Sequence, residues 1–110
     1  MTPNAFRKLA LALPGALEGA HMGHPDFRAG GRIFASLTAD GLRGMVKVTP
    51  AEQRTLVRAD RDAFEPANGA WGRQGCTMVT LAAADAATVR DALRSAHAAA
   101  VAPRPRKPRR

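Results

Sequence analysis

Apolar residues recur at helical spacing at the start of the chain, where Phe6, Leu9 and Leu13 fall on one face of a predicted helix. Thr2 can cap this helix, and Pro14 ends it because proline disfavours the helical conformation in the residue before it. From residue 18 to residue 48 the pattern changes to short apolar segments separated by turn residues, which is typical of β-strands. The first half of the chain is therefore predicted to form a helix followed by antiparallel strands.

The segment PDFRAGGRIFASL is predicted to form a β-hairpin. Its glycine pair at 30–31 suits the two central positions of a tight turn, because both positions need a positive φ. With this turn, Phe27 faces Phe34 across the two strands, and the aromatic pair helps to fix their register. A further strand is predicted over 42–48, in LRGMVKV.

The second half of the chain begins with a helix signal in VTPAEQRTLV, where Thr49 and Glu52 have the spacing of a capping box. A glycine-marked loop then leads to a predicted strand at 76–81, CTMVTL, which is rich in β-branched residues. Asp85 can cap a last helix, which ends before Pro103. The apolar stripe of this helix consists of Val89, Leu93, Ala96 and Ala100.

This order of elements predicts an α+β domain with one antiparallel sheet, the N- and C-terminal helices packed on one face, and a short middle helix. The other face of the sheet is left open, and we expect the function of the protein there. A length of 110 residues fits one domain, which we assign to residues 1–103, followed by a disordered basic tail at 104–110.

The net charge of +8 is unevenly distributed along the chain. The segment 103–110, PRPRKPRR, holds five basic residues and no acidic one, so residues 1–103 carry only +3. A weakly basic domain with a basic tail is weaker evidence for nucleic-acid binding than a strongly basic domain would be. The single cysteine excludes an internal disulfide and fits a reducing compartment. Because no apolar run is long enough for a membrane span, we expect a cytoplasmic protein with no membrane partner.

Few residues of the chain suggest catalysis or metal binding. His21 and His24 are three positions apart, but Gly23 and Pro25 disfavour a helix there, and no signature spacing supplies further metal ligands. Cys76 lies in a predicted strand with no specific base or cation to activate it, which is typical of a small buried hydrophobe. We therefore expect no metal, no cofactor and no catalytic site.

Two other features indicate binding. Trp71 lies in the glycine-rich loop GAWGRQG, where the indole could face a partner or fill the edge of the core. The core position is favoured, because large apolar residues are few in this chain. Basic residues of the predicted strands and loops could either keep the sheet soluble or contact phosphates. The candidate nucleic-acid contacts are Arg28, Arg32, Arg43, Lys47, Arg73, Gln74, Arg104, Arg106, Lys107, Arg109 and Arg110.

Residues 5–102 resemble the MmcQ/YjbR-like family of small bacterial proteins in the segments LALPGALEG, GHPDFRAGGRIFASL, VKVTPAEQRTLV and GAWGRQGCTMVTL. The resemblance implies a CyaY-like α+β fold, an antiparallel sheet backed by two helices, and a double-wing arrangement in which hairpin wings contact DNA. The P-x-F-x-x-x-G-[KR]-x-F core of the family falls on Pro25, Phe27, Gly31, Arg32 and Phe34, and its lysine-bearing strand on Met45–Val48.

The chain departs from the family pattern at two places. Cys76 stands where relatives commonly carry tryptophan, and Ala96-His97 stands where many carry a serine–tyrosine or an aromatic pair.

The first hypothesis for the function is a monomeric, non-enzymatic DNA-binding protein of low sequence specificity. The alternative is a small-molecule or protein interaction module that uses a groove near Trp71, His21 and His24.

Overall fold

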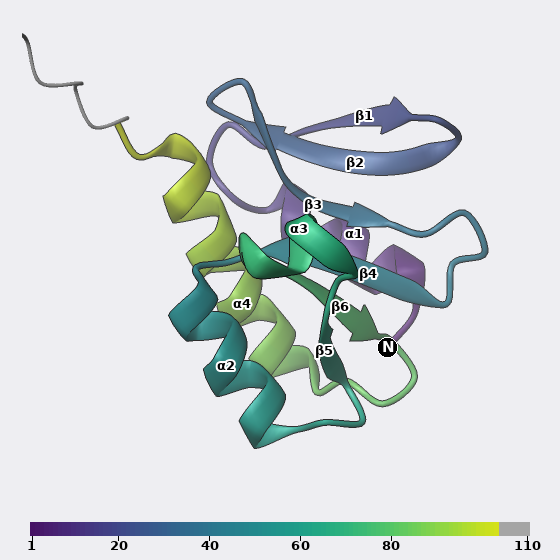
Figure 1. Cartoon of the computed structure of the whole chain (residues 1–110). Helices are drawn as coiled ribbons and strands as arrows, with labels where there is room; N and C mark the ends of the chain where they lie inside the picture. The colour runs from purple at the N-terminus through teal and green to yellow at the C-terminus, as the bar shows by residue number, and fades with distance from the viewer. Residues whose placement is uncertain (104–110) are drawn as a thin grey trace, which may run out of the picture.

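A computed structural model describes residues 1–103 of the chain. Within these residues six strands form one antiparallel sheet in the order β1-β2-β3-β4-β6-β5, with β1 and β5 at the edges (Figure 1). The strands are β1 (Leu17–His21), β2 (His24–Ala29), β3 (Arg32–Leu37), β4 (Arg43–Lys47), β5 (Phe64–Pro66) and β6 (Cys76–Thr80).

Four helices accompany the sheet in the described part of the chain: α1 (Pro3–Leu11), α2 (Pro50–Ala59), α3 (Gly69–Arg73) and α4 (Ala86–Val101). The predicted caps are confirmed, because the side chains of Thr2, Thr49 and Asp85 each accept a hydrogen bond from the backbone N–H three residues further on. Helices α1 and α4 cover one face of the sheet, α3 lies against the other face, and α2 runs beside α4 toward β5 (Figure 1).

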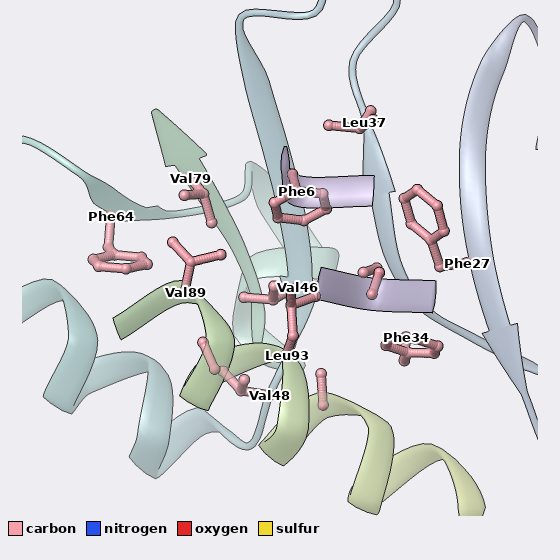
Figure 2. Close-up of a cluster of buried hydrophobic side chains, with 14 of the residues drawn as sticks. Phe6, Phe27, Phe34, Leu37, Val46, Val48, Phe64, Val79, Val89 and Leu93 are labelled. Carbon is pink, nitrogen blue, oxygen red and sulfur yellow. The ribbon is translucent and has the colours of Figure 1, made fainter. Parts of the chain in front are cut away.

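The hydrophobic core lies between the sheet and the helices α1 and α4 (Figure 2). Phe6 of α1 is fully buried, and its ring centroid is 6.1 Å from that of Phe27 on β2. Phe34 of β3 packs edge-on against His97 of α4, with 5.5 Å between ring centroids. The predicted α+β class, with the two terminal helices on one face of a single sheet, is confirmed.

The predicted hairpin has the right turn but the wrong register. The glycine pair at 30–31 occupies the central turn positions, with φ of 60° and 77°. The ladder shifts between Phe27 and the next residue, so that Phe27 pairs with Ala35 instead of Phe34. The Phe27 ring packs against Phe6 of α1, and the Phe34 ring packs against His97 of α4.

Candidate functional site

The open face of the sheet is lined by alternate residues of its central strands. Met45 of β4 pairs with Ser36 of β3 on one side and with Met78 of β6 on the other. Lys47 follows on the same face, whereas Val46 between them is fully buried on the helix side. The strand period of two therefore places the methionines and the lysine on the face that α1 and α4 leave uncovered.

A hollow of about 790 Å³ lies on this open face. Strand β2 contributes His24 and Arg28 to one side of the hollow, and α3 with the loop before it contributes the other side, including Trp71. The apolar part of its lining includes Ile33, Met45, Met78 and Cys76. Ligand pockets in proteins commonly measure about 300–1,000 Å³, so the hollow has the size of a binding site.

Trp71 does not fill the core, and the expectation that it would is wrong. The residue is 65% exposed and borders the hollow from α3. The four phenylalanines fill the core instead, and all four are buried. An exposed indole at the edge of a hollow is a feature of binding surfaces, because it offers a large apolar area with one polar N–H.

Helix α3 is fixed to the rest of the domain by one buried side chain and one close backbone approach. The Gln53 amide Nε2 of α2 donates hydrogen bonds to the carbonyl oxygens of Gly72 and Cys76, both at 2.9 Å. Gly72 itself passes so close to Ala67 that an added Cβ would lie 1.8 Å from the Ala67 carbonyl oxygen. Trp71 is therefore presented from a rigidly held turn of helix.

Arg28, a predicted phosphate contact, reaches the hollow but is engaged in an ion pair. Its Nε and Nη2 donate to the two carboxylate oxygens of Asp26 at 2.8 and 3.1 Å. The Asp26 carboxylate is almost fully buried, and the Arg28 guanidinium holds the pKa of Asp26 below its usual value. The same contact raises the pKa of Arg28, whose side chain stays half exposed.

Arg32 and Lys47 also line the hollow, and neither makes an ion pair with a carboxylate within residues 1–103. Both side chains also border a second hollow of about 250 Å³, which lies between the sheet, the start of α2 and the end of α4. Gln74 borders this second hollow and not the larger one. Two uncompensated cations therefore stand where the two hollows meet.

The remaining predicted contacts lie away from the hollow. Arg43 is on the open face, but its Nη1 donates to the Glu65 carboxylate at 2.9 Å. Arg73 is exposed at the end of α3 and does not line the larger hollow. The tail residues Arg104, Arg106, Lys107, Arg109 and Arg110 lie outside the described residues.

The two histidines lie directly opposite each other at the ends of β1 and β2, where His21 pairs with His24. His24 borders the hollow, whereas His21 is not part of its lining. Within residues 1–103 no group of three or more His, Cys, Asp or Glu side chains is arranged to hold a metal ion. Cys76 also borders the hollow, and burial raises the pKa of its thiol, which lowers the fraction of reactive thiolate.

Sequence reasoning did not predict the apolar floor of the hollow. It also did not predict the two hydrogen bonds by which Gln53 holds α3, which we call the Gln53 clamp. The alternation Met45, Val46, Lys47 in LRGMVKV carries the signal for the floor, because it places Met45 and Lys47 on one face of the strand. No local pattern marks Gln53, because its partners are two carbonyl groups about 20 residues further along the chain.

Comparison with known proteins shows a family match and a similar solved structure. The model of the YjbR family matches residues 11–99 of the chain. The chain belongs to the YjbR family. The crystal structure of the Deinococcus radiodurans protein DR2400, whose domain carries the family-model name DUF419, is similar to this YjbR protein with a TM-score of 0.74 and 24% sequence identity. The similarity covers 87% of this chain and 75% of the other.

Two further findings accompany the family assignment. A search of the curated proteins found no match to this YjbR-family chain. Among residues 1–103, no helix has both the length and the hydropathy needed to span a membrane.

Proposed function

We propose that this YjbR-family protein binds DNA on the open face of its sheet, as a monomer, with low sequence specificity and without catalysis. The observation that carries the proposal is the convergence of Arg28, Arg32 and Lys47 on one hollow beside an exposed tryptophan. Phosphate contacts need only positive charge at the right place and supply most non-specific affinity. A free thiol at Cys76 fits a reducing compartment, and the proposal places the protein in the cytoplasm.

The three cations of the hollow differ in their availability. Arg32 and Lys47 have no carboxylate partner within residues 1–103, so a phosphate can bind them without breaking an ion pair. Arg28 remains half exposed beside Asp26, so its guanidinium keeps donors on the solvent side. We therefore assign the main phosphate contacts to Arg32 and Lys47 and a weaker one to Arg28.

The test measures binding of a labelled oligonucleotide by fluorescence anisotropy over a range of salt concentrations. The reference protein is the full chain with the five basic tail residues replaced by glutamine, so that the tail cannot supply the affinity. In this background, Arg32→Gln combined with Lys47→Gln should lower the affinity. It should also reduce the slope of log K against log salt by about 1.4–1.8, since each of the two lost phosphate contacts contributes about 0.7–0.9.

A matched control is available on α2. Arg54 and Arg58 are exposed, one turn apart, and away from the open face, so their replacement by glutamine makes the same change in net charge. The control pair should leave affinity and slope nearly unchanged. The proposal is wrong if the tail-neutral chain shows no salt-dependent binding, or if the α2 pair weakens binding as much as the open-face pair does.

The alternative function, a small-molecule or protein interaction module, would use the same hollow. His24 and Trp71 stand on opposite sides of it, but His21 does not line it, so only part of the expected groove is formed. Thermal melting against a panel of metabolites distinguishes the two functions, because a ligand that binds the folded state raises Tm. A ligand that raises Tm, together with no binding of DNA, would favour the alternative.

A further inference from the structure

Trp71, which lies on α3, is an aromatic side chain that a ligand in the hollow can contact. It is the one tryptophan of the chain, which has no tyrosine, and the phenylalanines are buried. Other exposed large apolar residues, such as Leu42 and Met22, do not line the hollow. An exposed indole in the same hollow as Arg32 and Lys47 suits a ligand that combines a planar ring with negative charge.

We propose that Trp71 stacks on an unpaired base, so that the open face selects single-stranded DNA over duplex. This inference rests on the proposed function and specifies its substrate. Every base has a face on which an indole can stack, so stacking adds affinity without sequence preference. In a duplex the faces of the bases are already stacked on one another, so a protein reaches the phosphates and the base edges in the grooves but finds no free face for the indole.

The layout of the hollow supports a single strand. Between β2 on one side and β6 with α3 on the other there are three strand spacings, or about 14 Å. Arg32 and Lys47 are on the two central strands of this span, and Trp71 borders it from α3. A single strand can therefore place its phosphates over the central cations and turn a base toward α3.

The apolar floor of the hollow suits a base of any identity. Met45 and Met78 pair with each other across β4 and β6 and are partly exposed in the hollow. Methionine side chains are flexible and polarisable and make favourable contacts with aromatic rings, so they can adapt to a purine or a pyrimidine. The Gln53 clamp holds α3 in place before binding, so the backbone that carries Trp71 is already positioned when the ligand arrives.

The intrinsic fluorescence of the protein tests this inference directly, because all tryptophan emission comes from Trp71 and there is no tyrosine. In the tail-neutral full chain, a dT12 oligonucleotide should quench the emission. Inorganic polyphosphate, which carries charge but no bases, should bind without quenching. A 12-base-pair duplex should also leave the emission nearly unchanged.

Substitution separates stacking from charge. Trp71→Ala should lower the affinity for dT12 by about 5-fold to 150-fold, the range expected from loss of one stacked base. It should leave the salt slope unchanged, since no charge is removed, whereas Trp71→Phe should retain part of the affinity. Leu42→Ala removes a similarly exposed apolar side chain outside the hollow and should have no effect. Melting temperatures of all three variants check that they are folded.

The outcomes distinguish the inference from the proposed function. If dT12 binds with a normal salt slope but neither quenches Trp71 nor responds to Trp71→Ala, the stacking inference is wrong and DNA binding stands. Equal affinities of the tail-neutral chain for single strand and duplex would overturn the selectivity. If the tail-neutral chain binds neither, both proposals fail.

Discussion

Replacing Gln53 by methionine should loosen α3 and destabilise the domain. The Gln53 side chain is buried and donates to two carbonyl oxygens, those of Gly72 and Cys76. Each carbonyl keeps a second donor, because the N–H of Gly75 also reaches Gly72 and the N–H of Ala67 also reaches Cys76. The substitution therefore removes two hydrogen bonds without leaving a carbonyl oxygen unsatisfied.

The expected magnitude follows from those two bonds. At a net value of about 1 kcal/mol for each hydrogen bond, Gln53→Met should lower the free energy of unfolding by about 2 kcal/mol. For a domain of this size the change corresponds to a fall in Tm of roughly 10 °C. Methionine has a similar length and shape, so the change isolates the hydrogen bonds from the packing.

Urea denaturation followed by circular dichroism measures the stability change, and amide hydrogen exchange reports on α3. The amides of α3 and β6 should exchange faster in Gln53→Met, because the contact between α2 and these elements is lost. Arg54→Met, at the exposed neighbouring position, is the control and should change stability by less than about 0.5 kcal/mol. A Gln53→Met variant as stable as the control would refute the role of this side chain as a clamp.

Two other substitutions test the ion pair on β2 and the packing under the sheet. Asp26→Asn should raise the affinity for DNA severalfold, since it removes a negative charge and frees Arg28; unchanged affinity would show that Arg28 does not contact the ligand. Arg28 holds the pKa of Asp26 in the folded protein below 3.8. The native protein should therefore lose stability as the pH falls from about 4 through the lowered pKa of Asp26. In acid denaturation, Asp26→Asn should show a smaller loss of stability over the same pH range. Gly44→Ala places a Cβ 2.8 Å from the ring of Phe6 and should lower the unfolding free energy by about 1–3 kcal/mol; a neutral effect would mean that the ring can move aside.

Local signals account for most of the elements that were predicted correctly. The sequence predicts the caps Thr2, Thr49 and Asp85, because capping depends on residues three positions apart. The turn at 30–31 was identified because two adjacent positive φ angles strongly favour glycine. The edge strands β1 and β5 were missed, since both are short and largely exposed and carry no clear alternation.

The candidate site was harder to predict, because it depends on tertiary contacts. Sequence reasoning selected Arg28, Arg32 and Lys47, and the structure places all three around one hollow. Asp26 and Arg28 are two positions apart on β2 and so share a face of the strand, but only the structure shows that they form an ion pair and that the Asp26 carboxylate is buried in it. The scarcity of large apolar residues predicts a core position for Trp71, but four phenylalanines and a set of small residues fill the space without it.

The most direct test of DNA binding on the open face is to map the bound oligonucleotide by NMR. In a titration of the tail-neutral, 15N-labelled protein with dT12, the amide chemical-shift changes should cluster on β3, β4, β6 and α3, around Ser36, Met45 and Met78. The indole N–H of Trp71 should be among the most strongly shifted signals. Shift changes confined to α2 and α4, or no shift changes at all, would contradict the account.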